Sequence, residues 1–282
     1  MLRGPARLTL AACAAAWLLA APACAQTAAP APRVGQAGKD VEWVPTPPRV
    51  VQRMLRMAQT TSRDTVIDLG SGDGIIPITA ARKFGARALG IEFDAALVKL
   101  AERKADAAGV AQRVRFVQGD LFSADLSRAT VLTLYLQQNL NLELRPRILS
   151  LRPGTRVVSH RFGMGDWAPD EVSLIDGHRA YLWIVPANVI GAWSLELGPH
   201  ARPLELSFEQ RFQNIGGYVM LGELQAGLRE ARLRGARIDF AYVDRDGVRR
   251  EFRGSATRMR MRMQGSFRAE DGSTGRWVAL KR

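Results

Sequence analysis

The segment VIDLGSGDG, residues 66–74, combines a β-branched run, an aspartate and three glycines at alternate positions. Alternate glycines let a chain turn tightly and let a ligand lie directly against the backbone. The spacing departs from the Gly-x-Gly-x-x-Gly fingerprint of dinucleotide sites, which would place a glycine where Ile75 stands. The loop also lacks the Lys-Ser/Thr pair of a phosphate-binding loop. It therefore predicts a nucleoside with a small amino-acid tail, whose ammonium group Asp68 can meet directly or through water.

Two further acids stand at the ends of later strand-like runs. GIEFD places Glu92 18 residues after Gly74, where a carboxylate can accept both hydroxyls of a ribose. VQGDLF places Asp120 where it can accept from an adenine amino group, with Leu121 and Phe122 to flank the ring. Either acid alone can equally be a loop residue or a cap, and Asp120 can cap the turn that follows it. Their occurrence together after the glycine loop favours the nucleoside site.

Strand and helix patterns alternate from about residue 41 to residue 185. The strand-like runs are nearly continuous in apolar character, which is typical of parallel strands covered on both faces. They are Thr65–Leu69, Arg87–Phe93, Arg113–Gln118, Thr130–Leu136 and Thr155–Arg161. Helical patterns occupy 47–59, 94–109 and 138–154, and 170–186 resembles a hairpin that closes the sheet. This order predicts an α/β fold with a Rossmann-like doubly wound sheet, whose ligands bind beyond the carboxyl ends of the strands.

The motifs DLGSGDG, GIEFD and GDLF resemble those of class I S-adenosylmethionine-dependent methyltransferases. WVPTPPRVVQRML (43–55) resembles the segment that closes over the cofactor in a bacterial branch similar to the ATP synthase c-subunit lysine methyltransferase. Residues 129–162 continue this similarity. The resemblance covers about 43–185, and it implies S-adenosyl-L-methionine as the cofactor, transfer of a methyl group to a protein amine, lysine first, and no metal. The implied cofactor-binding residues are Thr46, Asp68, Gly70, Ser71, Gly72, Gly74, Glu92, Asp120 and Leu121.

The fourth strand-like run ends in LYLQQN, where amide-nitrogen methyltransferases carry Asn/Asp-Pro-Pro-Tyr. This difference argues against glutamine or adenine amino groups as acceptors. Tyr135 is the catalytic candidate as a wall of the acceptor channel, with a core aromatic as the alternative. Thr46 either binds the methionine carboxylate of the cofactor or caps the helix at 47–59. His160 is a possible base, although a structural residue at the surface is the favoured interpretation.

The first 25 residues are typical of a secretory signal peptide, because Arg3 and Arg7 precede an apolar run that ends in Ala23-Cys24-Ala25. We expect cleavage after Ala25 and a periplasmic or secreted protein, or a membrane-anchored one if the leader is retained. Both cysteines of the chain lie in this leader, so the mature chain has no disulfide or cysteine-based metal site. Residues 26–42 form a Pro/Ala-rich linker.

We expect the methyltransferase domain to span 43–186 and a β-rich domain of unknown role, a small barrel or sandwich, to span 187–282. Helical patterns give way there to short alternating strands, and Asp246-Gly247 is a strong hairpin signal. In RMRMRM (258–263), alternation predicts Met259, Met261 and Met263 on one face of a strand and three arginines on the other. The arginines form either a basic binding face or, in the favoured interpretation, a solvated outer face.

The formal charge of +13, from 40 basic and 27 acidic side chains, is spread over the chain without a polybasic tail. It indicates a solvated basic surface or an acidic partner, with no clear nucleic-acid site. An exported leader is unusual for an enzyme whose cofactor is made in the cytosol. It favours an alternative function, namely a non-catalytic module that binds S-adenosylmethionine or S-adenosylhomocysteine while the β-rich domain recognises a partner or envelope component.

Overall fold

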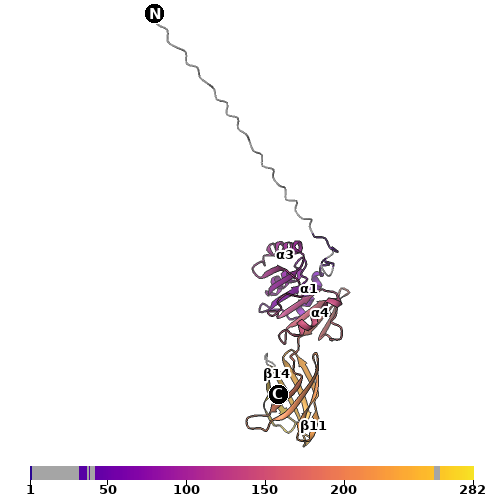
Figure 1. Ribbon diagram of the computed structural model, residues 1–282, viewed down its shortest axis with the longest axis vertical. Helices are drawn as coiled ribbons and strands as arrows, with labels where there is room; N and C mark the ends of the chain where they lie inside the picture. The colour runs from indigo at the N-terminus through magenta and orange to yellow at the C-terminus, as the bar shows by residue number, and fades with distance from the viewer. Residues whose placement is uncertain (2–31, 37, 39–41, 257–260) are drawn as a thin grey trace. The chain divides into compact units, whose positions relative to one another are not determined.

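The computed structural model describes Met1 and residues 32–36, 38, 42–256 and 261–282 (Figure 1). Apart from Met1, the predicted leader lies outside the described residues, as does most of the linker. The chain from Pro32 to Arg282 forms one compact unit. Within it the strands form two sheets, one of seven strands and one of nine.

The seven-stranded sheet has the order β3-β2-β1-β4-β5-β7-β6. Strands β1 to β5 are parallel, and β7 joins β5 in the antiparallel direction, followed by β6 through the predicted hairpin. The chain therefore moves outward from β1 in both directions, and the switch point lies between β1 and β4. The strands are β1 (Thr65–Leu69), β2 (Arg87–Glu92), β3 (Val114–Gln118), β4 (Val131–Leu134), β5 (Arg156–His160), β6 (Glu171–Ile175) and β7 (His178–Ile184). This confirms the predicted doubly wound sheet.

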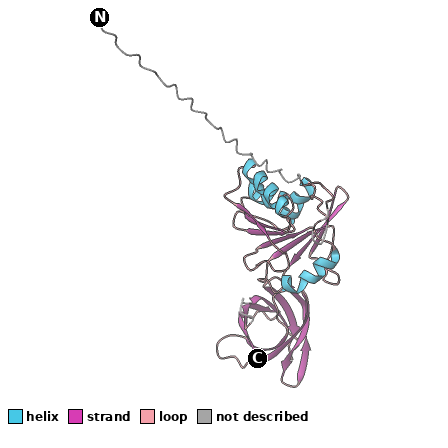
Figure 2. Cartoon of the chain, turned by 45° about the horizontal axis from the view of Figure 1, so that its top comes forward, coloured by secondary structure: helices cyan, strands magenta, loops and turns pink. Residues whose placement is uncertain are grey.

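Four helices cover the two faces of this sheet, as Figure 2 shows. They are α1 (Pro48–Met57), α2 (Ile75–Phe84), α3 (Ala95–Ala107) and α4 (Gln138–Leu149). Alternation along β1 sends Val66 into a core shared with α1, α2 and α3, and sends Ile67 and Leu69 into a core shared with α4. The helix predicted over 47–59 is observed as α1, and one apolar stripe of this segment is buried throughout: Val50, Val51, Met54, Leu55, Met57 and Ala58.

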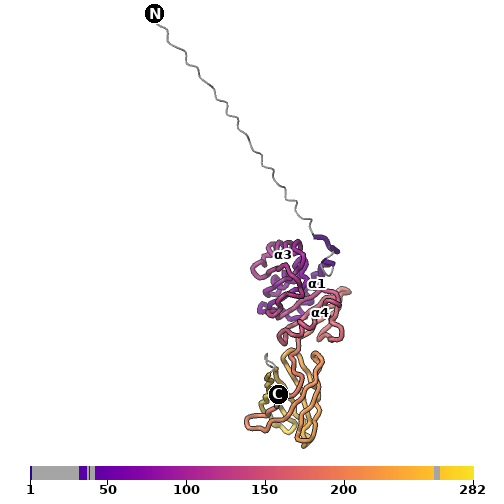
Figure 3. The backbone as a smooth tube through the Cα atoms, in the orientation of Figure 1, coloured from indigo at the N-terminus to yellow at the C-terminus, as the bar shows by residue number. Residues whose placement is uncertain are grey.

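The nine-stranded sheet is antiparallel, with the order β11-β10-β9-β8-β16-β15-β14-β13-β12. Its strands curl into a nearly closed barrel, the first of the two predicted forms, and they make up the orange and yellow end of the trace in Figure 3. They are β8 (Gly191–Glu196), β9 (Leu204–Arg211), β10 (Asn214–Leu221), β11 (Leu224–Gly227), β12 (Arg229–Arg234), β13 (Arg237–Val243), β14 (Arg249–Ala256), β15 (Arg262–Ala269) and β16 (Thr274–Lys281). The predicted turn at Asp246-Gly247 joins β13 to β14.

Aromatic side chains fill the interior of the barrel that this second sheet forms. The rings of Phe240 and Phe252 stack with their centroids 4.7 Å apart, and Trp277 meets both edge-on. The prediction for the methionines was wrong at Met261, which precedes β15 and is 58% exposed, whereas Met263 within the strand is buried. Met259 lies outside the described residues.

The segment that joins the two sheets is held by hydrogen bonds. Ala187 N donates to Gly235 O and Val189 N to Gln210 Oε1, each at 2.8 Å. Phe212, in the turn between β9 and β10, stacks on Trp167 with ring centroids 5.8 Å apart. A side chain of the second sheet therefore packs on the core that α4 shares with the first sheet. The domain boundary at 186/187 stays a prediction.

Candidate active site

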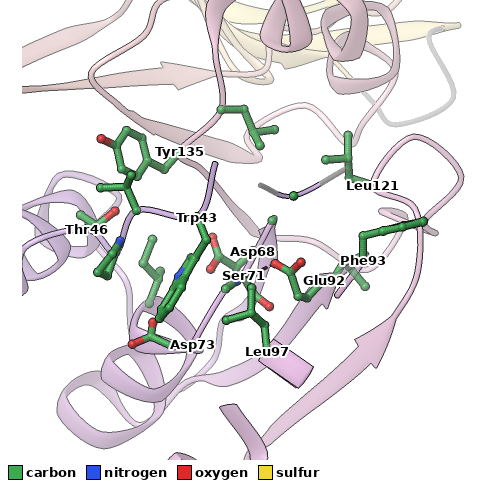
Figure 4. A pocket seen from close by; sticks show the side chains of 18 of the residues that line it. Trp43, Thr46, Asp68, Ser71, Asp73, Glu92, Phe93, Leu97, Leu121 and Tyr135 are labelled. Carbon is green, nitrogen blue, oxygen red and sulfur yellow. Dashed lines mark hydrogen bonds between the residues drawn. The ribbon is translucent and has the colours of Figure 1, made fainter. Parts of the chain in front are cut away.

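A cavity of about 80 Å³ lies at the carboxyl ends of β1, β2 and β4, where the topology predicts a ligand. Nine of the ten residues predicted for the site line it, and Gly74 does not. Figure 4 shows Thr46 and Tyr135 toward one side of the view, and Glu92 and Leu121 toward the other. The nine are Thr46, Asp68, Gly70, Ser71, Gly72, Glu92, Asp120, Leu121 and Tyr135.

The three loop glycines all have left-handed backbone angles, with φ of 72° at Gly70, 52° at Gly72 and 78° at Gly74. This confirms the tight turn that their spacing predicts. Side chains of the protein lie close to Gly72 and Gly74. A Cβ at Gly72 would meet Trp43 Nε1 at 2.5 Å, and one at Gly74 would meet Phe116 at 2.5 Å. Gly74 therefore serves the packing of the core, and Gly72 accommodates the Trp43 indole.

Glu92 anchors the glycine loop to the end of β2. Its Oε2 accepts from Gly72 N at 2.8 Å, and its Oε1 accepts from Asp94 N at 3.0 Å. Asp94 in turn caps α3, because its Oδ1 accepts from Ala96 N at 2.7 Å. Each carboxylate oxygen of Glu92 keeps further acceptor capacity toward the cavity. Binding of ribose hydroxyls by Glu92 stays a prediction.

Asp68 is buried at the end of β1, where Thr133 Oγ1 donates to its Oδ1 at 2.6 Å. Burial, together with the nearby carboxylates of Glu92 and Asp73, raises the pKa of the Asp68 carboxyl to about 7. The hydrogen bond from Thr133 opposes this rise. A cation in the cavity would remove the unfavourable interaction among these three acids.

Asp73 is a site residue that the sequence analysis did not select. It is buried, and Lys104 Nζ of α3 lies 2.5 Å from its Oδ2. Its Oδ1 and the Ser71 hydroxyl are buried atoms with no hydrogen-bond partner among the described residues, and both residues line the cavity. Unpaired buried polar atoms in a cavity wall call for a polar ligand or water. Together with the acids they fit S-adenosylmethionine, whose ammonium and sulfonium groups are cationic and whose ribose donates hydrogen bonds.

Asp120 caps the turn that follows β3, one of the two roles weighed for it. Its Oδ1 accepts from Phe122 N at 2.8 Å, and it also lines the cavity beside Leu121. Arg147 of α4 also stabilises this turn, because its guanidinium donates to the carbonyl oxygens of Phe122 and Ala124. The contact of Asp120 with adenine stays a prediction.

Trp43 is the second residue that sequence reasoning missed. Its indole lies beside the loop that carries Ser71 and Asp73 in Figure 4. The segment before it is tied to the rest of the protein, since Gln36 Nε2 donates to Asp94 Oδ2 at 2.8 Å. The sequence signal was present in WVPTPP, but the tryptophan has no periodic partner that indicates where its ring lies.

One cluster of side chains lies on the opposite side of the cavity from Glu92. It contains Thr46, Tyr135, His160 and His178. Thr46 Oγ1 lies 3.3 Å from His160 Nδ1, and His160 Nε2 lies 3.0 Å from His178 Nδ1. The Tyr135 ring covers His160 at 4.0 Å between centroids. The capping alternative for Thr46 is wrong, because α1 begins after Pro47 and has no side-chain cap. The surface placement of His160 is also wrong, since its side chain is fully buried.

Burial of the His160 ring, together with the charges of His178 and Arg161, lowers the pKa of the imidazole to about 4. The side chain is therefore neutral at neutral pH. Within the part of the chain that the structure describes, no group of three or more His, Cys, Asp or Glu side chains could hold a metal ion.

Comparisons with known proteins place this geometry in a family. The ANTKMT methyltransferase domain matches residues 68–171. A protein-lysine N-methyltransferase of Saccharolobus islandicus is 42% identical over 151 residues, which cover 51% of this chain and 94% of that protein. The lysine N-methyltransferase of the ATP synthase c-subunit from Xenopus laevis is 30% identical over 131 residues, 46% of this chain and 57% of that protein.

A solved structure supports the same assignment. An RNA methyltransferase from Salinibacter ruber in complex with S-adenosyl-L-homocysteine is 54% identical, with a TM-score of 0.51, over 52% of this chain and 96% of that one. The fold and the site therefore define a class I S-adenosylmethionine-dependent methyltransferase. Within that class, the chain belongs to the family of the ANTKMT methyltransferase domain. The cofactor predicted from the motifs is S-adenosylmethionine, and the comparisons bear this out.

Proposed function

We propose that this methyltransferase transfers the methyl group to a lysine amine of a protein. The observation that carries the proposal is the charge of the cavity. Its described lining contains five acids and no lysine or arginine, in a chain whose formal charge is +13. The five are Glu42, Asp68, Asp73, Glu92 and Asp120. Such a lining attracts an ammonium-bearing side chain and opposes phosphate.

S-adenosylmethionine, when bound, supplies a methyl group on a positively charged sulfur that is already an activated leaving group. The protein has to hold that group in line with the acceptor nitrogen and exclude water. Glu92, Asp68 and the loop 70–74 would hold the cofactor, and Asp120 would accept from its adenine amino group with Leu121 beside the ring. Tyr135 and Leu136 supply an apolar wall where the acceptor enters. An apolar wall favours the neutral amine, which is the nucleophilic form.

Two relatives that act on protein lysine support this choice of acceptor. One observation favours a second candidate, since the Salinibacter ruber chain, an RNA methyltransferase, is 54% identical. RNA would have to bring a base into the acidic cavity while its phosphates bind outside. The comparisons give no support to the alternative of a non-catalytic binding module.

Radiolabelled transfer separates these candidates. The full chain is incubated with S-adenosylmethionine, tritiated in the methyl group, and with a total extract of protein and RNA. We expect label that resists ribonuclease, is released by protease and is recovered as methyl-lysine after hydrolysis. Label that ribonuclease releases would overturn the lysine assignment in favour of RNA, and the absence of any transfer would overturn both.

We also propose that the protein is exported, as the sequence of residues 1–25 indicates, with membrane association if the leader is retained. Among the described residues, no helix is long and apolar enough to cross a membrane.

A further inference from the structure

His160 is a fully buried titratable side chain that the proposed transfer has not yet used. It stands at the end of β5, directly behind two residues that line the cavity, Thr46 and Tyr135. A buried imidazole needs a partner for each ring nitrogen, and His160 has one on each side. Thr46 Oγ1 lies 3.3 Å from Nδ1, and His178 Nδ1 lies 3.0 Å from Nε2.

Two opposite sets of protonation states satisfy both contacts, and the one that carries protons outward begins at Thr46. The Thr46 hydroxyl donates to Nδ1 of His160, whose Nε2 carries a proton and donates to Nδ1 of His178. His178 then carries its own proton on Nε2. It stands at the start of β7, directly after the turn at Asp176-Gly177, and is partly exposed to solvent. The three side chains thus form a continuous line of hydrogen bonds from the cavity wall to the surface.

A lysine acceptor creates the need for such a line. The side chain arrives as an ammonium ion and has to lose a proton before its nitrogen can attack. The acids that line the cavity are poor outlets for this proton, because a proton left on them would stay beside the cofactor. We infer that Thr46, His160 and His178 form the exit path for the proton of the acceptor amine, an inference that rests on the proposed lysine acceptor.

The transfer balances along this path. The ammonium passes a proton to Thr46 Oγ1, the Thr46 proton moves to His160 Nδ1, the Nε2 proton of His160 moves to His178 Nδ1, and the Nε2 proton of His178 passes to water. The nitrogen lone pair then forms the N–C bond, and the electron pair of the broken C–S bond stays on sulfur. None of the three enzyme side chains keeps a charge, but both imidazoles end with the proton on Nδ1, and they return to the first tautomers before a further methylation uses the path.

The environment of His160 favours a side chain that passes a proton on over one that holds it. The groups around it are His178, the Tyr135 ring, Thr46 and the exposed Arg161, and none of these is a carboxylate. The low pKa of the imidazole keeps it neutral, with one nitrogen free to accept while the other donates. The path also assigns the Thr46 hydroxyl to the acceptor side of the cavity, and not to the cofactor's carboxylate.

The test compares histidine variants of the full chain. The acceptor is a synthetic lysine-rich peptide. If the enzyme does not methylate this peptide, the methylated protein extract takes its place. We expect His160→Gln and His178→Gln to lower kcat by roughly 10²-fold, the lower end of the range for assisted proton transfer. The affinity for S-adenosylmethionine, measured by titration calorimetry, should stay within twofold. His200→Gln, a change to the chain's third histidine in an exposed turn, is the matched control and should behave as the wild type.

Rescue separates a proton path from a merely structural role. His178→Ala opens space at a partly exposed position, so added imidazole should restore most of its kcat and do nothing for His200→Ala. The rescue should increase with pH as the added imidazole becomes neutral. Because His178 is not fully buried, this arm holds even if His160→Gln fails to fold.

The proton path would be overturned if His178→Ala kept the kcat and pH profile of the wild type. It would also be overturned if His178→Ala lost activity that added imidazole never restored. In either case methyl transfer by the wild type would leave the lysine acceptor intact. A wild type that methylates no protein would instead overturn the proposed function, and the path with it.

Discussion

Replacing Glu92 with alanine tests whether the end of β2 holds the cofactor. In the free protein the Glu92 carboxylate already accepts two backbone N–H groups, from Gly72 at 2.8 Å and from Asp94 at 3.0 Å. Glu92→Ala therefore removes the anchor of the glycine loop as well as the predicted acceptor of the ribose hydroxyls. A hydrogen bond to a charged group contributes about 1.5–3 kcal/mol. The loss of even one such bond from the complex should weaken cofactor binding at least about tenfold, since about 1.4 kcal/mol corresponds to one decade.

Titration calorimetry of the full chain with S-adenosylmethionine, and separately with S-adenosylhomocysteine, measures this loss. Glu92→Gln keeps an oxygen for only one of the two amides, so its affinity should fall between wild type and Glu92→Ala. Glu102→Ala, a change to an exposed residue of α3, is the control and should bind as the wild type does. The melting temperature of the free Glu92→Ala protein should also fall, because two backbone amides lose their partner. Unchanged affinity in Glu92→Ala, or tight binding of NAD by the wild type, would refute the assignment of this site.

Three more outcomes follow from the site and from the leader. Burial raises the pKa of Asp68 to about 7 from an ordinary value of 3.8. At a pH between these two values, Asp68 is protonated in the folded protein and ionised in the unfolded chain. The stability of the free protein should therefore fall as pH rises from about 4 to about 7, and Asp68→Asn should remove that fall in thermal unfolding; parallel curves for the two proteins would contradict it. Gly72→Val should weaken cofactor binding more than tenfold in calorimetry, because the new side chain displaces Trp43. Gly109→Val, with a similar φ of 68° but open space around its Cβ, should lose only stability, and equal binding losses in both would refute this explanation. An alkaline phosphatase fusion after residue 40 should be active, and the mature protein should begin at Gln26; an inactive fusion with Met1 retained would place the enzyme in the cytosol.

The parts of the fold that depend on local pattern could be predicted from the sequence. The apolar stripe of α1 and the β-branched runs of the parallel strands each carry their own signal, because burial repeats with the period of the element. The glycines at 70, 72 and 74 likewise predict left-handed backbone angles without any knowledge of the residues that surround them in the fold. Strand ends were predicted one or two residues too long, as at Thr130–Leu136 against the observed Val131–Leu134. Strand pairing stops there where the chain turns into the site.

The parts that depend on contacts between distant segments could not be predicted in this way. Thr46, His160 and His178 come from three different elements, and no local pattern shows that they meet. A single histidine after a strand gives no sign of its burial, which is why a surface position was expected for His160. The packing of the Trp43 ring against Gly72 could not be predicted for the same reason, because Trp43 lies outside the sheet.

The stacking of Phe212 on Trp167 has a consequence for the ancestry of the chain. Trp167 is 1% exposed and donates through Nε1 to Gln213 Oε1 at 2.9 Å, so both its face and its polar edge are covered from the β9–β10 turn. A relative without these later strands would present a bare indole to water at this position. Such a relative should carry a smaller or polar residue there, or recruit another protein to cover the ring. The identity of the residue aligned with Trp167 thus becomes a marker in genomes for whether the second sheet was gained or lost along a lineage.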